Sequence, residues 1–236
     1  MQRYFVDIDS NSEFVFSKQD IFHISKVMRM KINDQVEVVN NNKVYLVNID
    51  SFSPFKVHII KENPSESELP VEVRIFLPLL KSDKAELIIQ KATELGVTSI
   101  IFYLSKRSII HLNNEDFVRK ITRYLSIAKE ASEQSHRSVI PDIKGIIFLK
   151  DIDKYMLKNN LFAYERLAGS TISLSNALID KGSYSIIVGP EGGYDDSEVS
   201  ILLEKGFTPI SLGKRILRVE TAAIYALSVI SYALEK

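Results

Sequence analysis

The spacing of apolar positions changes once along the chain, near residue 70. Before that point, short runs rich in β-branched residues alternate with turn signals: QVEVVN and KVYLVNI flank Asn40–Asn42, and FKVHII follows Pro54. Short runs separated by asparagine and proline are typical of strands joined by hairpins. The first part of the chain therefore predicts a small β-rich barrel.

One stretch within this first part, SKQDIFHISKVMRMK, has helical spacing instead. Ser17 and Asp20 stand three residues apart, as the two partners of a capping box do. Ile21, Ile24 and Met28 follow at the spacing of one apolar helix face. The pattern predicts one short helix inserted in the barrel.

The segment KENPSESELP at 61–70 interrupts the apolar pattern with prolines, serines and glutamates, which predicts a linker. Strands and helices alternate after it, beginning with a buried strand at 72–79 and a helix capped by Ser82 and followed by Gly96. Further expected strands are 97–104, 161–165 and 184–188, and further expected helices are 115–134, 196–204 and 219–234. Such alternation predicts an α/β fold in which helices cover a mostly parallel sheet.

We expect two domains, at 1–68 and 71–236. Composition and charge limit the kinds of site that these domains can carry. Thirty basic and thirty acidic residues leave a net charge of zero, so any nucleic-acid surface has to be local. The chain has no cysteine, which excludes disulfides, thiolate metal sites and cysteine nucleophiles. The four histidines show no metal spacing, and no metal is expected. The chain's start lacks a signal-peptide pattern and no apolar run is long enough to span a bilayer, so we expect a cytoplasmic protein.

The stretch IIVGPEGGYDDSEV places a glycine-rich turn between an expected strand and an expected helix. Ligands of open α/β sheets bind beyond the carboxyl ends of strands, where such turns lie. Gly189, Gly192 and Gly193 allow positive φ and close approach of a ligand to the backbone, while Pro190 stiffens the turn. The stretch matches neither phosphate-binding glycine motif, and Glu191 would repel a phosphate, so a neutral or cationic ligand is favoured. A turn that merely needs glycine is the alternative.

Two other segments carry unusual polar clusters. SLGKRILRVETAAIYAL places Arg215, Arg218 and Glu220 at the start of a helix, and a surface ion-pair cluster is the alternative to a functional site there. AKEASEQSHRSVIP ends a helix with Gln134 and Arg137 among other polar residues, for which a solvated helix end is the alternative.

These segments together resemble a known family. LPLLKSDKAELIIQKATELGVTSI, KEASEQSHRSVIP, IIVGPEGGYDDSEV and LGKRILRVETAA are similar, in order and spacing, to the signature blocks of the RsmE family. Members of that family are ribosomal-RNA uridine N3-methyltransferases of the SPOUT class. The resemblance covers nearly the whole chain, because the first seventy residues are similar to the family's PUA-like RNA-binding barrel.

The resemblance implies a fold, a cofactor and a partner that spacing alone does not give. It implies a C-terminal trefoil knot that binds S-adenosyl-L-methionine, and a homodimer in which each cofactor site lies near the partner subunit. The cofactor-binding residues that it implies are Tyr164, Glu165, Gly189, Pro190, Glu191, Gly192, Gly193, Leu212, Gly213, Arg215, Ile216, Leu217 and Arg218. The implied function is methylation of N3 of a specific uridine in small-subunit (16S) ribosomal RNA.

The chemistry of that reaction suggests roles for two residues. Uridine N3 carries a proton and becomes a good nucleophile only when that proton leaves. A positive group near O2 or O4 would stabilise the resulting anion, and a carboxylate or water could accept the proton. Arg218 and Glu220 are the candidates for these catalytic roles.

Local positive charge indicates where RNA would bind. Lys26, Arg29 and Lys31 stand in HISKVMRMK with no acidic residue between them, and Arg107 lies in a loop after an expected strand. Such charges can position phosphates, although an ordinary solvated face is the alternative. The predicted RNA-binding set is completed by Gln134 and Arg137.

Two rival classes remain open from the sequence. One is a noncatalytic RNA-binding protein with a degenerate knot, which the intact glycine-rich and arginine-rich segments argue against. The other is a nucleotide-binding enzyme of Rossmann type, whose phosphate-binding loop the chain lacks.

Overall fold

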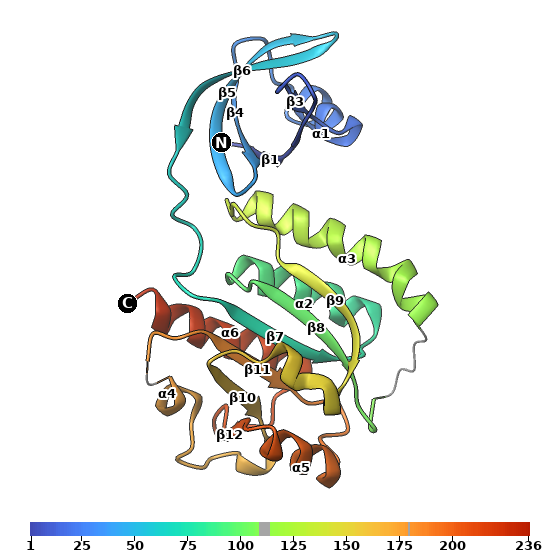
Figure 1. Cartoon of the computed structure of the whole chain (residues 1–236), viewed down its shortest axis with the longest axis vertical. Coiled ribbons are helices and arrows are strands. Elements are labelled where there is room, and N and C mark those ends of the chain that lie inside the picture. The colour runs from blue at the N-terminus through green and yellow to red at the C-terminus, as the bar shows by residue number, and fades with distance from the viewer. Residues whose placement is uncertain (109–113, 179) are drawn as a thin grey trace. The chain divides into compact units, whose positions relative to one another are not determined.

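The computed structural model describes residues 1–108, 114–178 and 180–236, and for 114–116 it describes the backbone alone (Figure 1). The chain forms two compact units. The first unit contains residues 1–68 and 132–139, and the second contains 69–131 and 140–236. The short segment 132–139 thus joins the first unit although most of the sequence around it belongs to the second.

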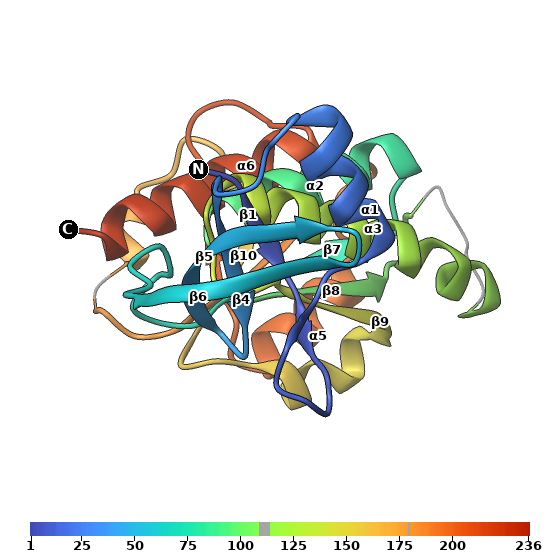
Figure 2. The same cartoon turned by 90° about the horizontal axis from the view of Figure 1, so that it is seen from above.

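The first unit is β-rich, as its apolar pattern predicts. A four-stranded sheet has the order β1 (Arg3–Phe5), β4 (Gln35–Asn40), β5 (Lys43–Phe52), β6 (Phe55–Asn63), and a two-stranded sheet joins β2 (Asp7–Ile8) to β3 (Phe14–Val15). The pairs β4–β5 and β5–β6 are antiparallel, and Figure 2 shows the long β5–β6 hairpin clearly. Asn41 and Asn42 both have positive φ, +48° and +62°, which is the backbone that a two-residue hairpin turn requires.

The helix inserted in this unit is shorter and less regular than its pattern predicts. The capping box is confirmed: Asp20 N–H donates to Ser17 Oγ at 3.0 Å and Ser17 N–H donates to Asp20 Oδ2 at 3.2 Å. After one turn, α1 (Lys18–Phe22) widens into a π-helix, His23–Val27, in which Met28 N–H bonds to His23 O. The wider turn leaves Ile24 fully buried but Met28 40% exposed, so the prediction of Met28 as part of the apolar face is wrong.

The second unit contains a six-stranded sheet in which every pair of neighbours is parallel. The order is β12 (Thr208–Ile210), β10 (Asn159–Ala163), β11 (Tyr184–Val188), β7 (Val73–Pro78), β8 (Ser99–Leu104), β9 (Asp142–Phe148). The helices are α2 (Ser82–Glu94), α3 (Asn114–Gln134), α4 (Leu174–Ala177), α5 (Asp196–Glu204) and α6 (Val219–Leu234), with short 3₁₀ turns at Leu149–Tyr155 and Glu165–Leu167. The predicted α/β class is confirmed.

Both faces of this sheet are buried. Along β11, Ile186 packs in the core that contains α2, α3 and α6, whereas its neighbour Ile187 packs in a second core with Leu202 of α5. Successive side chains of a strand point to opposite faces, so burial of both requires helices on both sides. In Figures 1 and 2, α2 and α6 lie side by side on the first face, and their contact is direct.

Strands β10, β11 and β12 are neighbours in this sheet and run in the same direction. Their carboxyl ends therefore lie at one edge of the sheet. The loops that leave this edge begin at Tyr164, Gly189 and Ser211. They carry the segments that the sequence singles out for chemistry.

Candidate active site

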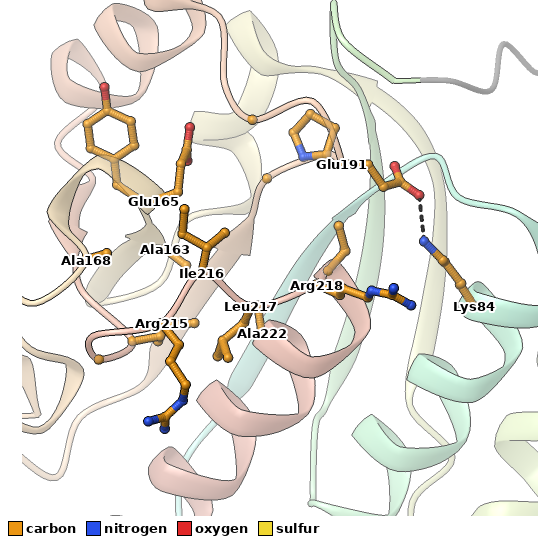
Figure 3. A pocket seen from close by; sticks show the side chains of 17 residues that line it. Lys84, Ala163, Glu165, Ala168, Glu191, Arg215, Ile216, Leu217, Arg218 and Ala222 are labelled. Atoms are coloured by element: carbon orange, nitrogen blue, oxygen red, sulfur yellow. Dashed lines mark hydrogen bonds and ion pairs between the residues drawn. The ribbon is translucent and has the colours of Figure 1, made fainter.

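A cavity of about 380 Å³ lies at the carboxyl ends of these three strands (Figure 3). A volume in this range is typical of small-molecule sites. The lining residues are Lys84, Ala163, Tyr164, Glu165, Ala168, Gly189, Pro190, Glu191, Gly193, Leu212, Gly213, Arg215, Ile216, Leu217, Arg218, Val219 and Ala222. Every residue of the predicted cofactor set except Gly192 is among them. The structure thus brings the set together, while cofactor binding by these residues stays a prediction.

The glycines of the turn after β11 make room for neighbouring side chains. Gly193 has φ +69°, and a Cβ placed there would lie 2.5 Å from Glu165 Oε1. A Cβ on Gly189 would lie 2.9 Å from the ring of Tyr194. Of the three glycines in the turn, only Gly193 takes the positive φ that the sequence allowed. The turn therefore needs glycine at 193 for its backbone and at 189 for space.

Gly192 lies beside Arg107 instead of lining the cavity. A Cβ at Gly192 would lie 3.1 Å from Arg107 Cβ, and Arg107 Nη1 donates to Gly192 O at 3.4 Å. Arg107 also reaches Asp195 Oδ2 at 3.5 Å. The structure accordingly gives Arg107 a contact with the glycine-rich turn that the sequence did not predict.

The helix after the turn starts with a capping box. Ser197 N–H donates to the Asp195 carboxylate at 3.1 Å, and Asp195 N–H donates to Glu198 Oε2 at 2.8 Å. The hydrogen bonds to Ser197 hold the pKa of Asp195 below its usual range, at about 2. Glu198 is buried and its other oxygen accepts from Lys106 N–H at 3.0 Å, which ties the loop after β8 to this helix.

The segment after β12 forms the other wall of the cavity. Gly213 has φ +113°, and its N–H and the Ser211 hydroxyl are 3.2 Å apart in a tight turn. Figure 3 shows Arg215 directed away from the cavity centre and Arg218 directed toward Lys84. Arg218 is the N-cap residue of α6, so its position is fixed by the start of that helix.

Lys84 is a lining residue that the sequence reasoning missed. Its ammonium lies 3.1 Å from Glu191 Oε1 and 3.7 Å from Glu220 Oε2. The hydrogen bond to Glu191 raises the pKa of Lys84 above its usual value, more than burial lowers it. The signal that could have located it is its place in the first turn of a helix that follows β7 at the same edge of the sheet.

Glu220 is placed differently from the other predicted catalytic residue. Arg218 lines the cavity, whereas Glu220 does not. Glu220 Oε2 is shielded from solvent and has no hydrogen-bond partner among the described residues. Its charge therefore lies next to the lining residue Lys84.

All of the predicted RNA-binding residues except Arg137 are exposed. Lys26, Arg29, Lys31 and Gln134 are exposed in the first unit, and they are accompanied by the exposed apolar residues Phe22 (60%) and Val27 (56%), which the sequence reasoning did not single out. Their RNA binding stays a prediction.

Arg137 requires a correction. It is only 1% exposed, and its guanidinium pairs with Glu68 Oε2 at 2.6 Å. A buried arginine held by a carboxylate cannot reach a phosphate, so Arg137 has a structural role: it fastens residues 132–139 to the rest of the first unit.

Two further features can be stated for the described part of the chain. It contains no group of three or more histidine or acidic residues placed to hold a metal ion. None of its helices combines the length and the apolar character needed to cross a membrane.

Comparison with known families matches both units. A family model described as an RNA methyltransferase domain matches residues 67–231, and one described as an RNA methyltransferase PUA domain matches residues 16–53. These two matches, on a chain whose parallel sheet carries a cavity at its strand ends, show the class of the protein: it is an RNA methyltransferase.

Similar proteins show to which family of RNA methyltransferases the chain belongs. The chain is 36% identical to the ribosomal RNA small subunit methyltransferase E of Bacillus subtilis over all of this chain and 98% of that protein, and 36% identical to that of Mesomycoplasma hyopneumoniae over 97% and 98%. The chain therefore belongs to the RsmE family of ribosomal RNA small subunit methyltransferases.

Two solved structures resemble the fold over nearly its full length. A Legionella pneumophila methyltransferase in complex with S-adenosylmethionine has a TM-score of 0.86 at 27% identity, covering 98% of this chain and 97% of that one. The Neisseria gonorrhoeae ribosomal RNA small subunit methyltransferase E bound to S-adenosylmethionine has the same TM-score at 26% identity, with coverage of 98% and 97%.

Proposed function

We propose that the protein methylates N3 of a uridine in small-subunit (16S) ribosomal RNA, with S-adenosyl-L-methionine as the methyl donor. The observation that carries this proposal is the cavity, in which the glycine-rich turn and the segment Leu212–Arg218 meet. The names of the relatives and the cofactor bound in the Legionella and Neisseria structures support it. We further propose a cytoplasmic homodimer with a knotted second unit, as the family resemblance implies.

The residues of the cavity fit the proposed cofactor. Gly189, Pro190 and Gly193 line the cavity, so the backbone of the turn borders a ligand bound there. Ala163, Leu217 and Ala222 offer apolar surface to an adenine ring. Glu165 and Glu191 give the cavity carboxylates, which suit a cationic ligand and disfavour a phosphate.

The chemistry can be divided between cofactor and protein. The bound cofactor supplies a methyl group on a sulfonium, which needs no metal for transfer. The protein has to place uridine N3 in line with that methyl group and to favour loss of the N3 proton. Arg218, whose side chain lines the cavity, would stabilise the negative charge that develops on the uracil oxygens. Glu220 would support this step by orienting the uracil anion or by accepting the proton.

RNA binding is proposed for the exposed basic residues. Lys26, Arg29 and Lys31 can contact phosphates, and Phe22 offers an aromatic face on which a base can stack. Arg107, beside the glycine-rich turn, is placed to contact RNA near the cavity of the second unit. Gln134 completes the proposed set.

The proposed function is tested by ligand binding and by product analysis. Calorimetry should detect binding of S-adenosylmethionine and no binding of NAD. Ribosomal RNA from a strain that lacks the gene should have lost one N3-methylated uridine, and the gene should restore it. A strain with an unchanged set of modified uridines would reject the proposed reaction.

A further inference from the structure

Lys84 is a cation of the cavity lining that the proposed function has not used. Lys84 stands in the first turn of α2, and its ammonium meets Glu191 of the glycine-rich turn and Glu220 of α6. The side chains of Lys84, Glu191 and Glu220 are 25%, 23% and 18% exposed. At such exposure, charge interactions are screened less than on an open surface. Three separate elements therefore meet at one partly desolvated ammonium.

Lys84 and Glu220 differ in their access to the cavity. Lys84 lines the cavity and Glu220 does not. Glu220 Oε2 is buried with no hydrogen bond among the described residues, and its ion-pair partner is Lys84 at 3.7 Å. A buried carboxylate oxygen without a hydrogen bond is costly unless a nearby charge compensates it. Glu220 thus influences the cavity through the ammonium that it attracts.

Lys84 and Arg218 form a pair of cations on one side of the cavity, as Figure 3 shows. Two like charges repel, and the charge of Arg218 lowers the pKa of Lys84. The hydrogen bond and charge of Glu191, with the charge of Glu220, outweigh this effect and burial, so Lys84 remains an ammonium. An ammonium has three donors, and Glu191 takes one in a hydrogen bond of 3.1 Å. The remaining donors are available to an anion in the cavity.

We propose that Lys84 is a catalytic residue that stabilises the uracil anion together with Arg218, and that Glu220 is a positioning residue that holds the Lys84 ammonium at the cavity wall. This inference rests on the proposed function. In the step, the N3–H bond breaks and the proton passes to water. The N3 electron pair then forms the new bond to the methyl carbon. The carbon–sulfur bond breaks, and its electron pair stays on sulfur as a neutral thioether.

The paired cations lower the pKa of bound uridine N3, because they stabilise its deprotonated form. Loss of one cation raises that pKa, so the rate should rise with pH over a more alkaline range. The charged groups that face Lys84 from the packed elements are Glu191, Glu220 and Arg218. Lys91, which pairs with Glu94 at 2.8 Å in the same helix and does not line the cavity, provides a matched control.

The experiment compares Lys84→Met, Lys84→Arg, Glu220→Gln and Lys91→Met with the wild type. Single-turnover methylation of small-subunit particles is measured from neutral to alkaline pH, with cofactor affinity by calorimetry and the melting temperature. Lys84→Met should lower the rate at neutral pH about 100-fold and change cofactor affinity by less than about threefold. The pH of half-maximal rate should move up. Glu220→Gln should move it in the same direction by less, Lys84→Arg should recover part of the rate, and Lys91→Met should match the wild type.

The outcomes separate this inference from the proposed function. A wild type that forms no N3-methyluridine overturns both. A wild type that forms it, with Lys84→Met at full rate per folded molecule, overturns the role of Lys84 alone. A Lys84→Met variant that loses melting temperature and cofactor affinity but keeps the wild-type pH profile identifies a merely structural ion pair, which also overturns it.

Discussion

The residue type at some positions of the cavity is fixed by neighbouring side chains. Gly193 combines a positive φ with a position against the Glu165 carboxylate, so neither its backbone nor its surroundings accept a side chain. The carboxylate comes from the loop after β10 and the glycine from the loop after β11. The loops that follow these two adjacent strands therefore meet where the Glu165 side chain lies against the backbone of Gly193.

Gly193→Ala should weaken binding of S-adenosylmethionine by about tenfold or more, which corresponds to about 1.4 kcal/mol. The added Cβ would lie 2.5 Å from Glu165 Oε1, and the displaced carboxylate would intrude on the cavity. Calorimetry measures the effect. Gly206→Ala is the control, because Gly206 has a similar φ of +85° but would place its Cβ 4.0 Å from Met156, outside the cavity. Equal affinities in the two variants would show that Gly193 is not required for its space.

Two helices begin next to the segments that line the cavity. The capping box of Asp195 and Glu198 starts α5 directly after the glycine-rich turn, and Arg218 starts α6 at the cavity. The sequence predicted the bounds of β11, α5 and α6, because their apolar patterns are regular. It placed Ser82 at the cap of α2, whereas Lys81 is the N-cap and makes no side-chain hydrogen bond there.

Asp195→Ala should destabilise the start of α5 in a pH-dependent way. The pKa of Asp195 is lowered from 3.8 to about 2, first by the hydrogen bonds to Ser197. A depressed carboxyl pKa contributes stability above the unfolded value and loses it as pH falls toward the folded value. The difference in melting temperature between wild type and variant should be full at neutral pH and shrink between about 3.8 and about 2.

The control for this prediction is Asp196→Ala. Asp196 is the next residue in the same helix and forms an exposed ion pair with Arg166 at 2.9 Å. Exposed pairs of this kind contribute little. A melting-temperature difference for Asp195→Ala that stays constant with pH, or that Asp196→Ala reproduces, would argue against the capping box as its cause.

Elements that depend on distant contacts were not predictable from local pattern. Strand β9 was missed because Lys144 and Gly145 interrupt its apolar run, and its exposure is that of an edge strand. Residues 132–139 belong to the first unit because of contacts such as Arg137 with Glu68 and Phe5 N–H with Glu133. Nothing in the spacing near residue 137 indicates a partner some seventy positions earlier.

At the scale of the whole molecule, the proposed catalytic site lies in the second unit, whereas the proposed RNA-binding residues lie in the first unit except for Arg107. The first unit carries the exposed cations Lys26, Arg29 and Lys31, and the second carries the cavity. The sequence singled out the glycine-rich and arginine-rich segments of the cavity, and the family resemblance added Tyr164 and Glu165. It missed Lys84, since a single lysine in a helix has no pattern of its own, and it could not foresee that Glu220 pairs with Lys84 without lining the cavity.

Arg29→Glu should weaken RNA binding and reduce the slope of log affinity against log salt by about one unit, because one phosphate contact is lost. Binding of S-adenosylmethionine should be unchanged, since Arg29 does not line the cavity. Lys43→Glu is a suitable control, because Lys43 is exposed in the same unit and pairs with Glu62 at 3.3 Å. If both variants keep the wild-type salt slope, RNA does not contact Arg29.

The central claim is that this cavity transfers a methyl group to N3 of a uridine with Arg218 stabilising the uracil anion. The most direct measurement is single-turnover methylation of small-subunit particles by wild type, Arg218→Ala and Arg218→Lys, at saturating S-adenosylmethionine, with product nucleosides identified by mass spectrometry. The wild type should yield N3-methyluridine, Arg218→Ala should be slower by about 100-fold or more, and Arg218→Lys should recover only part of the rate. A different methylated nucleoside from the wild type would contradict the reaction, and an Arg218→Ala variant at full rate would contradict the role of the arginine.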